Sequence, residues 1–182
     1  MKELSQNILD IAENSYKANA TLVEIIIIED DENLQFTIRD NGTGMTEDTR
    51  LRLTDPFYTA RTTRKVGMGI PLLKLAAEQA GGGVEIESRH FSTHPENHGT
   101  SVRAFFKKNV IDFTPLGDVI SMVATLVQGH PDIDLYFEHT LSGGAVSLDT
   151  REIRAVLEEI PLDSFEVIVW IRECLAEQYN SI

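Results

Sequence analysis

The sequence contains little positive charge, a single cysteine and no long hydrophobic run. Its 16 Lys and Arg stand against 29 Asp and Glu, a net charge of −13, and because an acidic surface repels phosphate backbones we expect no nucleic-acid partner. Cys174 has no second cysteine with which to form an internal disulfide, which favours a reducing cytoplasm. The apolar run at residues 25–28 is far shorter than the about 20 residues of a membrane helix. We therefore predict no membrane span and, with a polar pattern already at the N-terminus, no signal peptide.

Charge is also unevenly distributed along the chain. Residues 1–108 carry 13 Lys and Arg against 16 Asp and Glu, a net of −3, whereas residues 109–182 carry 3 against 13, a net of −10. The length of 182 residues suits one domain with an appendage, and the composition changes after Lys108. We therefore predict a domain over residues 1–108, a linker over 109–115 and an acidic appendage over 116–182 that binds a partner or forms a homodimer.

Hydrophobic periodicity predicts a mixture of helices and strands. Helices are expected at residues 2–17, 70–80 and 116–127, with a short one from an N-cap at Thr46 to about residue 53. Strands are expected at residues 22–29, 34–38, 84–88, 101–106, 133–139 and 145–148. Two capping boxes, Asp149-x-x-Glu152 and Asp163-x-x-Glu166, predict the starts of two more helices. The last of these has an apolar stripe made of Phe165, Ile168, Ile171 and Leu175.

The segment Asp40-Asn41-Gly42-Thr43-Gly44 follows the second predicted strand and allows two interpretations. One is a hairpin turn, because Asn-Gly after an alternating strand is a favourable turn. A helix start rather than a strand follows at Met45 and Thr46, however, which favours a strand end that presents a carboxylate between closely approaching glycines. Such a carboxylate accepts a hydrogen bond from an exocyclic amine, for example that of adenine.

Two further groups of residues suit phosphate and metal chemistry. Gly67-Met68-Gly69 leads into a predicted helix N-terminus, where free N–H groups attract anions. One interpretation of this segment is therefore an anion-binding site, to which the cations of Arg61, Arg64 and Lys65 contribute. The alternative is an ordinary loop in which these cations are solvated. The first helix carries a polar stripe, which is either a solvated face or a set suited to water activation, Mg²⁺ coordination and phosphate contact. The stripe consists of Asn7, Asp10, Asn14 and Lys17.

These parts follow one another as in the GHKL superfamily, which includes gyrase-type topoisomerases, Hsp90 chaperones, MutL proteins, sensor histidine kinases and anti-sigma kinases. Residues 1–107 resemble it in five motifs: residues 9–15 resemble the N box, Asp40-x-Gly42-x-Gly44 the G1 box, residues 55–59 the F box before the ATP lid, residues 66–70 the G2 box and Gly99-Thr100 the last motif. The resemblance implies an α+β fold, a two-layer α/β sandwich with a mixed, mostly antiparallel sheet and helices on one face, plus the small C-terminal α/β appendage.

The resemblance also implies roles for individual residues. Asn14 would ligate Mg²⁺, and Asp40 would accept a hydrogen bond from the adenine amine with support from Thr100. The implied ATP-binding set is Asn14, Lys17, Asp40, Gly42, Gly44, Met45, Phe57, Thr59, Arg61, Lys65, Gly67, Met68, Gly69 and Thr100.

Two residues depart from the family pattern. Hydrolytic members have a Glu four residues before the N-box Asn as the base that activates water, and here that place is Asp10, one methylene shorter. Asp10 is the candidate catalytic base, and whether ATP is hydrolysed stays open. Glu13 is expected to face Lys17. Lys65 stands where the G2 box has its first glycine, which adds a cation to the loop.

The histidines and the cysteine are expected to be structural. His90, His94 and His98 recur every four residues, but Pro95 and Gly99 place them in a loop, so we do not expect them to bind metal. We expect His130 and His139 at the surface or in turns, and Cys174 as a small core residue.

Residues 109–182 are similar in outline to the tails of small stand-alone, histidine-kinase-like ATP-binding proteins of anaerobic bacteria, often encoded beside iron hydrogenase genes. The resemblances together imply a Mg-ATP-binding, kinase-like regulator that acts in trans on a protein partner. Two alternatives stay open. One is an interaction module that is gated by ATP without catalysis, and the other is a slow ATPase that assists assembly of a redox complex.

Overall fold

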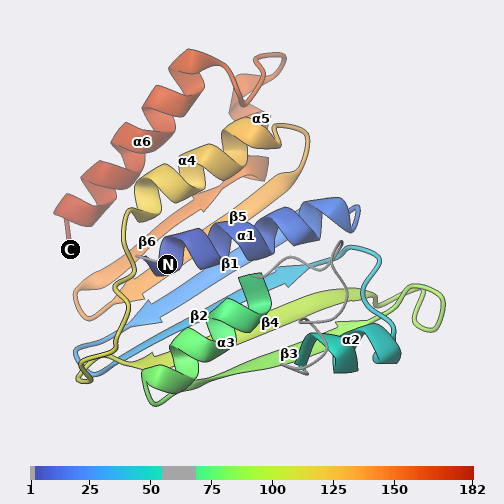
Figure 1. The fold of residues 1–182 in the computed structure, drawn as a ribbon. Coiled ribbons are helices and arrows are strands. Elements are labelled where there is room, and N and C mark those ends of the chain that lie inside the picture. The colour runs from blue at the N-terminus through green and yellow to red at the C-terminus, as the bar shows by residue number, and fades with distance from the viewer. Residues whose placement is uncertain (1–2, 55–68) are drawn as a thin grey trace.

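The computed structural model describes residues 3–54 and 69–182, which form six helices and six strands within these ranges (Figure 1). The helices are α1 (Leu4–Lys17), α2 (Glu47–Thr54), α3 (Gly69–Gln79), α4 (Val119–Gly129), α5 (Thr150–Leu157) and α6 (Phe165–Asn180). The strands are β1 (Leu22–Glu29), β2 (Asn33–Asp40), β3 (Gly83–Arg89), β4 (Gly99–Lys107), β5 (Asp134–Leu141) and β6 (Gly144–Asp149). The predicted order of elements is confirmed, and most bounds agree to within three residues.

All six strands belong to one sheet, in the order β3-β4-β2-β1-β5-β6. Every neighbouring pair is antiparallel except β1 and β5, which run parallel, with Ile25 opposite Phe137. The predicted α+β class with a mixed, mostly antiparallel sheet is therefore confirmed. The C-terminal segment contributes β5 and β6 to this same sheet rather than a sheet of its own. The domain boundaries predicted at residues 108 and 116 stay a prediction.

The hydrophobic core lies between the helices and one face of the sheet. Alternate residues of each central strand point to this face, and Phe36, Phe106 and Phe137 are fully buried there. Helix α1 packs between α3 and α4, and α6 packs against α4 and β6, so the helices cover one face, as predicted (Figure 1). Polar side chains such as Arg39 and Arg103 are exposed on the other face, which gives two layers.

Local side-chain chemistry explains several of the ends of elements. Thr46 caps α2, since its hydroxyl accepts from Thr49 N–H at 3.3 Å. Helix α4 begins three residues later than predicted, and Asp118 caps it through Ser121 N–H at 2.8 Å. The preceding carbonyls of Pro115 and Leu116 instead accept hydrogen bonds from Leu4 and Ser5 N–H, at 2.9 and 2.8 Å. The segment before α4 therefore satisfies the first donors of α1 and cannot itself be helical.

The last two helices confirm one predicted cap and correct another. Asp149 caps α5, since its carboxylate accepts from Arg151 N–H at 2.9 Å. Asp163 is not the cap of α6, because the N-cap is Ser164, which makes no side-chain capping bond. Phe165 is 77% exposed and lies outside the core. The first buried residue of α6 is Val167, since a helix starting at Phe165 turns residues 167, 168, 171 and 175 toward the sheet.

Of the two histidines predicted to lie at the surface or in turns, His130 does begin a turn, through Ile133 N–H to its carbonyl at 3.1 Å, whereas His139 is buried. His139 is buried in β5, with Nδ1 2.8 Å from the Tyr179 hydroxyl and Nε2 3.3 Å from a carboxylate oxygen of Glu29. His130 caps the end of α4 and is half-buried, stacked on Tyr16 with ring centroids 3.8 Å apart. The expectation for His139 was wrong because the sequence around a histidine in a β-strand does not show whether polar side chains from other elements will contact it in the core.

Candidate functional site

The candidate site is built around the carboxylate of Asp40, the last residue of β2. Ser15 of α1 donates its hydroxyl hydrogen to Oδ2 at 2.7 Å. The N–H groups of Gly42 and Thr100 donate to Oδ1 at 2.9 and 3.2 Å. Three separate parts of the fold, a helix, a loop and a neighbouring strand, thus fix one carboxylate in a single orientation.

The loop after Asp40 is held close to its neighbours. Thr43 N–H donates to the Ala18 carbonyl at 2.8 Å, and His98 Nδ1 lies 2.6 Å from the Gly42 carbonyl. Gly44 has φ +68°, and a Cβ there would lie 2.0 Å from the Arg89 carbonyl oxygen. This loop is not a hairpin turn, because α2 follows it. The structure therefore favours the second interpretation of the Asp40–Gly44 segment, a strand end that presents a carboxylate.

Thr100 contacts Asp40 through its backbone rather than through its side chain. Its hydroxyl oxygen lies 2.9 Å from Ser88 Oγ, which also accepts from Met45 N–H at 2.7 Å. Ser88 in this way ties the loop after β2 to strands β3 and β4. This role could not be predicted, because a serine at the end of an alternating strand resembles any exposed position.

A pocket of about 220 Å³ opens beside Asp40, several times the about 30 Å³ that a water molecule occupies. Its walls are mainly apolar, and its polar groups include the Asp40 carboxylate and the side chains of Asn14, Ser15, Thr49 and Thr100. Gly44 and Met45 also line it. The apolar lining residues are Ile11, Ala18, Ile38, Met45, Leu53, Ile70 and Val102. A flat, partly polar ring that carries a hydrogen-bond donor fits this combination.

The polar stripe of α1 divides into two parts. Asp10, Asn14 and Lys17 are exposed, whereas Asn7 is 1% exposed, so the prediction of one continuous polar face was wrong at Asn7. Asn14 lines the pocket, and Lys17 follows it one turn later on the same helix. Asp10 lies against the start of α3, since a Cβ on Gly69 would be 3.2 Å from Asp10 Cβ and 3.7 Å from its Oδ2. The carboxylate thus stands beside a helix N-terminus.

Glu13 was predicted to face Lys17, but it faces His130 instead. Its carboxylate oxygen lies 2.9 Å from His130 Nε2, across the contact between α1 and α4. Burial raises the pKa of the neighbouring Tyr16 hydroxyl above its usual value, and the Glu13 charge adds to this shift, so Tyr16 stays neutral. Glu13 therefore belongs to the packing of α1 on α4, and Asp10 is left as the carboxylate on the pocket side.

The remaining candidate residues fall outside the described ranges. These are Phe57, Thr59, Arg61, Lys65, Gly67 and Met68. Gly69 is the first described residue after them and begins α3. In the structure the residues predicted to bind adenine thus lie close to Asn14, and Asp10 lies beside the N-terminus of α3.

Comparison with known proteins assigns the fold. The family described as histidine kinase-, DNA gyrase B-, and HSP90-like ATPase matches residues 1–130 of the 182. The chain belongs to this family. Family membership and the fold together identify residues 1–130 as a GHKL ATP-binding domain of the histidine kinase type.

Two curated relatives show the same similarity. The nitrogen regulation protein NtrY of Azorhizobium caulinodans is 34% identical over 76 residues, which cover 42% of this chain and 9% of that protein. Sporulation kinase A of Bacillus subtilis is 30% identical over 108 residues, which cover 59% of this chain and 16% of the kinase. The chain therefore spans less than a fifth of the length of either relative.

A solved structure of the N-terminal domain of a DNA repair protein shares the fold, with a TM-score of 0.51, 16% identity, and coverage of 82% of this chain and 52% of that one. At this identity the likeness concerns the fold alone. In the described part of our chain, no helix combines the length and hydrophobicity that crossing a bilayer requires.

Residues that prediction did not include complete the site. Ser15 recurs at helical spacing with Leu4, Ile8 and Ile11 on the buried side of α1, and it is 4% exposed. A small polar residue at the end of a row of buried residues indicates that a polar group from another element lies beside it. Ser88 and His98 gave no such sign.

Proposed function

We propose that the chain binds Mg-ATP with the adenine ring in the pocket beside Asp40, and that it acts as a kinase-like regulator of a separate protein. The observation that carries the proposal is the Asp40 carboxylate, fixed by Ser15, Gly42 and Thr100 at the wall of an apolar pocket. A carboxylate already held by three donors needs no rearrangement to accept a further hydrogen bond from an amine, which favours binding.

The residues present also fit a metal-bound triphosphate. Asn14 supplies an amide oxygen at the pocket wall, and Asp10 supplies a carboxylate one turn earlier on the same face of α1. Oxygen donors of this kind are the ligands that Mg²⁺ prefers. Asn14 would hold the ion, and the bound ion would neutralise phosphate charge. Lys17 and the N-terminus of α3 would attract the phosphates electrostatically.

Asp10 is the candidate general base. Its carboxylate is exposed and stands beside the first turn of α3, where a helix N-terminus favours anions. In a transfer reaction Asp10 would take the proton of the acceptor side chain as the bond from acceptor to γ-phosphorus forms, and ADP would leave. One relative is named as a sporulation kinase, which supports phosphoryl transfer over simple hydrolysis.

Asp10→Asn tests the reaction. We expect γ-labelled ATP to label a co-purified protein with the natural chain and not with the variant, while calorimetry gives the same nucleotide affinity for both. Label transfer that survives in Asp10→Asn contradicts the role of Asp10. Phosphate release without a labelled acceptor supports the slow ATPase instead, and neither activity supports the ATP-gated module. Glu96→Gln, a change to an exposed acid in the loop between β3 and β4, is the matched control.

Asn14→Ala tests the metal. We expect loss of the Mg²⁺-dependent part of ATP affinity and little change in adenosine binding, because the amide lies at the phosphate side of the proposed arrangement. Equal weakening of ATP and adenosine would contradict the assignment of Asn14 to the ion.

A further inference from the structure

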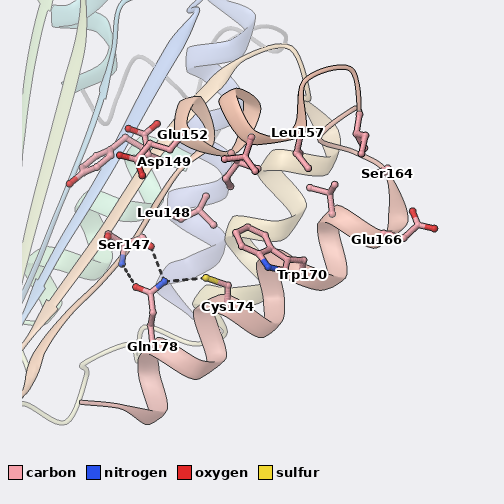
Figure 2. Close-up of a pocket in the computed structure, with 15 residues that line it drawn as sticks. Ser147, Leu148, Asp149, Glu152, Leu157, Ser164, Glu166, Trp170, Cys174 and Gln178 are labelled. Atoms are coloured by element: carbon pink, nitrogen blue, oxygen red, sulfur yellow. Dashed lines mark hydrogen bonds between the residues drawn. The ribbon is translucent and has the colours of Figure 1, made fainter.

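A second and larger cavity lies far from Asp40 in the sequence, in the C-terminal part of the chain. It is a groove of about 1020 Å³ between α5, the loop after it and α6, with β6 as its floor (Figure 2). All of its lining residues fall after residue 130, outside the segment that matches the ATPase family. The groove is therefore a feature that the family relationship does not account for.

Large apolar side chains line this groove and are unusually exposed. Val156 of α5 is 82% exposed, Ile160 of the following loop 55% and Trp170 of α6 51%. Leu148 and Ile153 extend the apolar surface toward the floor. Side chains of this size gathered in one concave surface are typical of a site that another molecule covers.

The groove is elongated along α6. Glu166, Trp170, Cys174 and Gln178 line it at intervals of four residues, on one side of the helix (Figure 2). At 1.5 Å per residue this row extends over about 18 Å, which matches three turns of an α-helix. An occupant that uses the whole groove is consequently long and narrow.

A strand is a poor candidate for this occupant, because the outer edge of β6 is already bonded at Ser147, the middle of the strand. β6 is the last strand of the sheet, and an added strand would have to hydrogen-bond to its outer backbone groups. The side-chain amide of Gln178 already accepts from Ser147 N–H at 2.9 Å and donates to the Ser147 carbonyl at 3.1 Å (Figure 2). Because this amide takes the place of a neighbouring strand, a helix is the favoured occupant.

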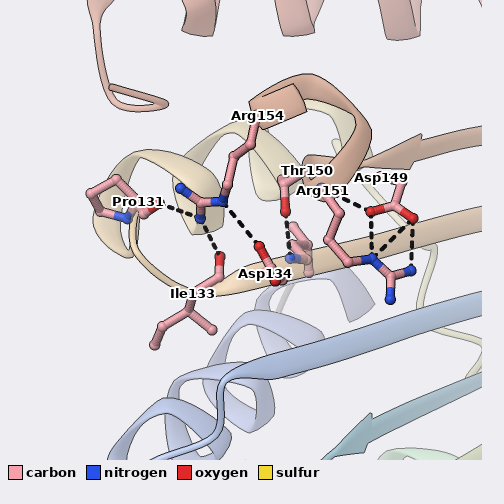
Figure 3. Close-up of polar contacts among 8 residues, drawn as sticks. Pro131, Ile133, Asp134, Asp149, Thr150, Arg151 and Arg154 are labelled. Atoms are coloured by element: carbon pink, nitrogen blue, oxygen red, sulfur yellow. Dashed lines mark hydrogen bonds and ion pairs between the residues drawn. The ribbon is translucent and has the colours of Figure 1, made fainter. Parts of the chain in front are cut away.

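Charge at the rim defines the chemistry of the partner. Glu152 and Glu166 line the groove from its two helical walls, and within the described ranges neither has an ion-pair partner. The three arginines of residues 109–182 are already engaged. Arg151 pairs with Asp149 at 2.7 Å and Arg154 with Asp134 at 3.0 Å (Figure 3). Arg172 donates to Ser121 Oγ at 3.0 Å. The groove thus combines a mainly apolar lining with one carboxylate on each of its two helical walls.

We propose that this groove binds a basic amphipathic helix from a partner protein, with its apolar side against Trp170 and its cations against Glu152 and Glu166. A second copy of this chain is disfavoured, because residues 109–182 carry a net charge of −10 and two such surfaces repel each other. The proposal is independent of nucleotide binding, since none of the residues lining the groove lines the pocket beside Asp40.

Trp170 provides a direct measurement, because it is the one tryptophan of the sequence. The probe is a synthetic peptide of about 14 residues, long enough for the groove, with leucines on one helical face and lysines on the other. Two control peptides have the same composition in scrambled order, or glutamate in place of lysine. We expect saturable binding of the first peptide alone, with a blue shift of Trp170 emission and weaker binding at about 0.5 M salt.

Charge reversal in the protein separates the groove from the general acidity of the chain. We expect Glu152→Lys with Glu166→Lys to raise the Kd of the peptide about tenfold or more. Asp31→Lys with Glu32→Lys makes the same change in net charge at the exposed turn between β1 and β2, and we expect it to have a much smaller effect.

Three outcomes would overturn the proposal. The first is that the scrambled peptide binds as tightly as the amphipathic one. The second is that both double variants weaken binding of the amphipathic peptide equally. The third is that Trp170 emission shifts with protein concentration when no peptide is present. The last outcome, with a dimer detected by sedimentation, would assign the groove to a second copy of the chain.

Discussion

Asp40→Asn separates recognition of the nucleotide from stability of the fold. In the unliganded chain the asparagine oxygen can keep both backbone donors, Gly42 and Thr100, now at 2.9 and 3.2 Å from Oδ1. Its amide nitrogen then takes the place of Oδ2, and the Ser15 hydroxyl must turn from donor to acceptor. The one other acceptor shown for this hydroxyl is the Ile11 carbonyl at 3.5 Å. All three bonds to residue 40 then change from charge-assisted to neutral, and because Asp40 is half-buried and solvent screens its charge, we expect a total loss of about 1 kcal/mol of stability.

The effect on ATP binding is larger than this, because the amide presents a donor to the adenine amine, which is itself a donor. The variant loses a hydrogen bond to a charged group, about 1.5–3 kcal/mol, and leaves a buried donor unpaired, about 1–3 kcal/mol. A total of about 3 kcal/mol corresponds to a Kd raised on the order of a hundredfold. The loss of affinity therefore exceeds the loss of stability about threefold in free energy.

Titration calorimetry with ATP and urea denaturation of the same samples measure the two quantities. Asp31→Asn, at the exposed turn after β1, makes the same change in charge and should leave both unchanged. Unaltered ATP affinity in Asp40→Asn would refute the assignment of Asp40 to adenine. A loss of several kcal/mol of stability with a proportionate loss of affinity would show that Asp40 serves the fold instead.

Two further substitutions test the surroundings of the site and the core. Gly44→Ala should destabilise the fold by about 2 kcal/mol or more, because alanine is strained at φ +68° and its Cβ would overlap the Arg89 carbonyl. Gly129→Ala is the control and should not destabilise the fold in this way, because a Cβ there meets nothing within 4 Å. Equal urea midpoints for the two variants would contradict this explanation. Glu29→Gln should destabilise the chain at neutral pH but progressively less in acid. The hydrogen bond from His139, and then the bond and charge of Lys108, hold the pKa of Glu29 below its usual value against the opposing effect of burial. Its ionised form therefore stabilises the fold above the unfolded pKa, and this contribution is lost as the pH falls through the lower folded pKa. The measurement is the free energy of unfolding of the natural chain and of Glu29→Gln as a function of pH. If the difference between them stays constant from neutral to acid pH, Glu29 acts without its charge.

The parts of the fold that depend on local chemistry could be predicted from the sequence. The turn after β1 is fixed by Asp30, whose carboxylate accepts from Glu32 and Asn33 N–H at 2.8 and 2.7 Å, and Asp is a residue typical of such turns. The helix start after Thr46 and the cap at Asp149 follow the same logic. Hydrophobic residues also located the strands, since β1 and β5 bury alternate residues along most of their length.

Features that depend on distant partners could not be predicted in this way. The parallel pairing of β1 with β5 joins Ile25 to Phe137 across more than a hundred residues, and no pattern within either strand specifies the other. The burial of His139 has the same origin, because Glu29 and Tyr179 come from other elements. In the site, Asp40 and the glycines were evident from a motif, whereas the hydroxyl of Ser15 became meaningful only when α1 lay beside the end of β2.

The parallel pair also determines where this chain could be divided. β1 is an inner strand, with β2 on one side and β5 on the other, and it contains four consecutive isoleucines from Ile25 to Ile28. A chain ending at residue 115 would expose the whole outer edge of this strand, together with the core face that α4 covers. An unprotected apolar edge of this length invites pairing with other chains. The part that carries the Asp40 pocket therefore depends on the acidic part for solubility.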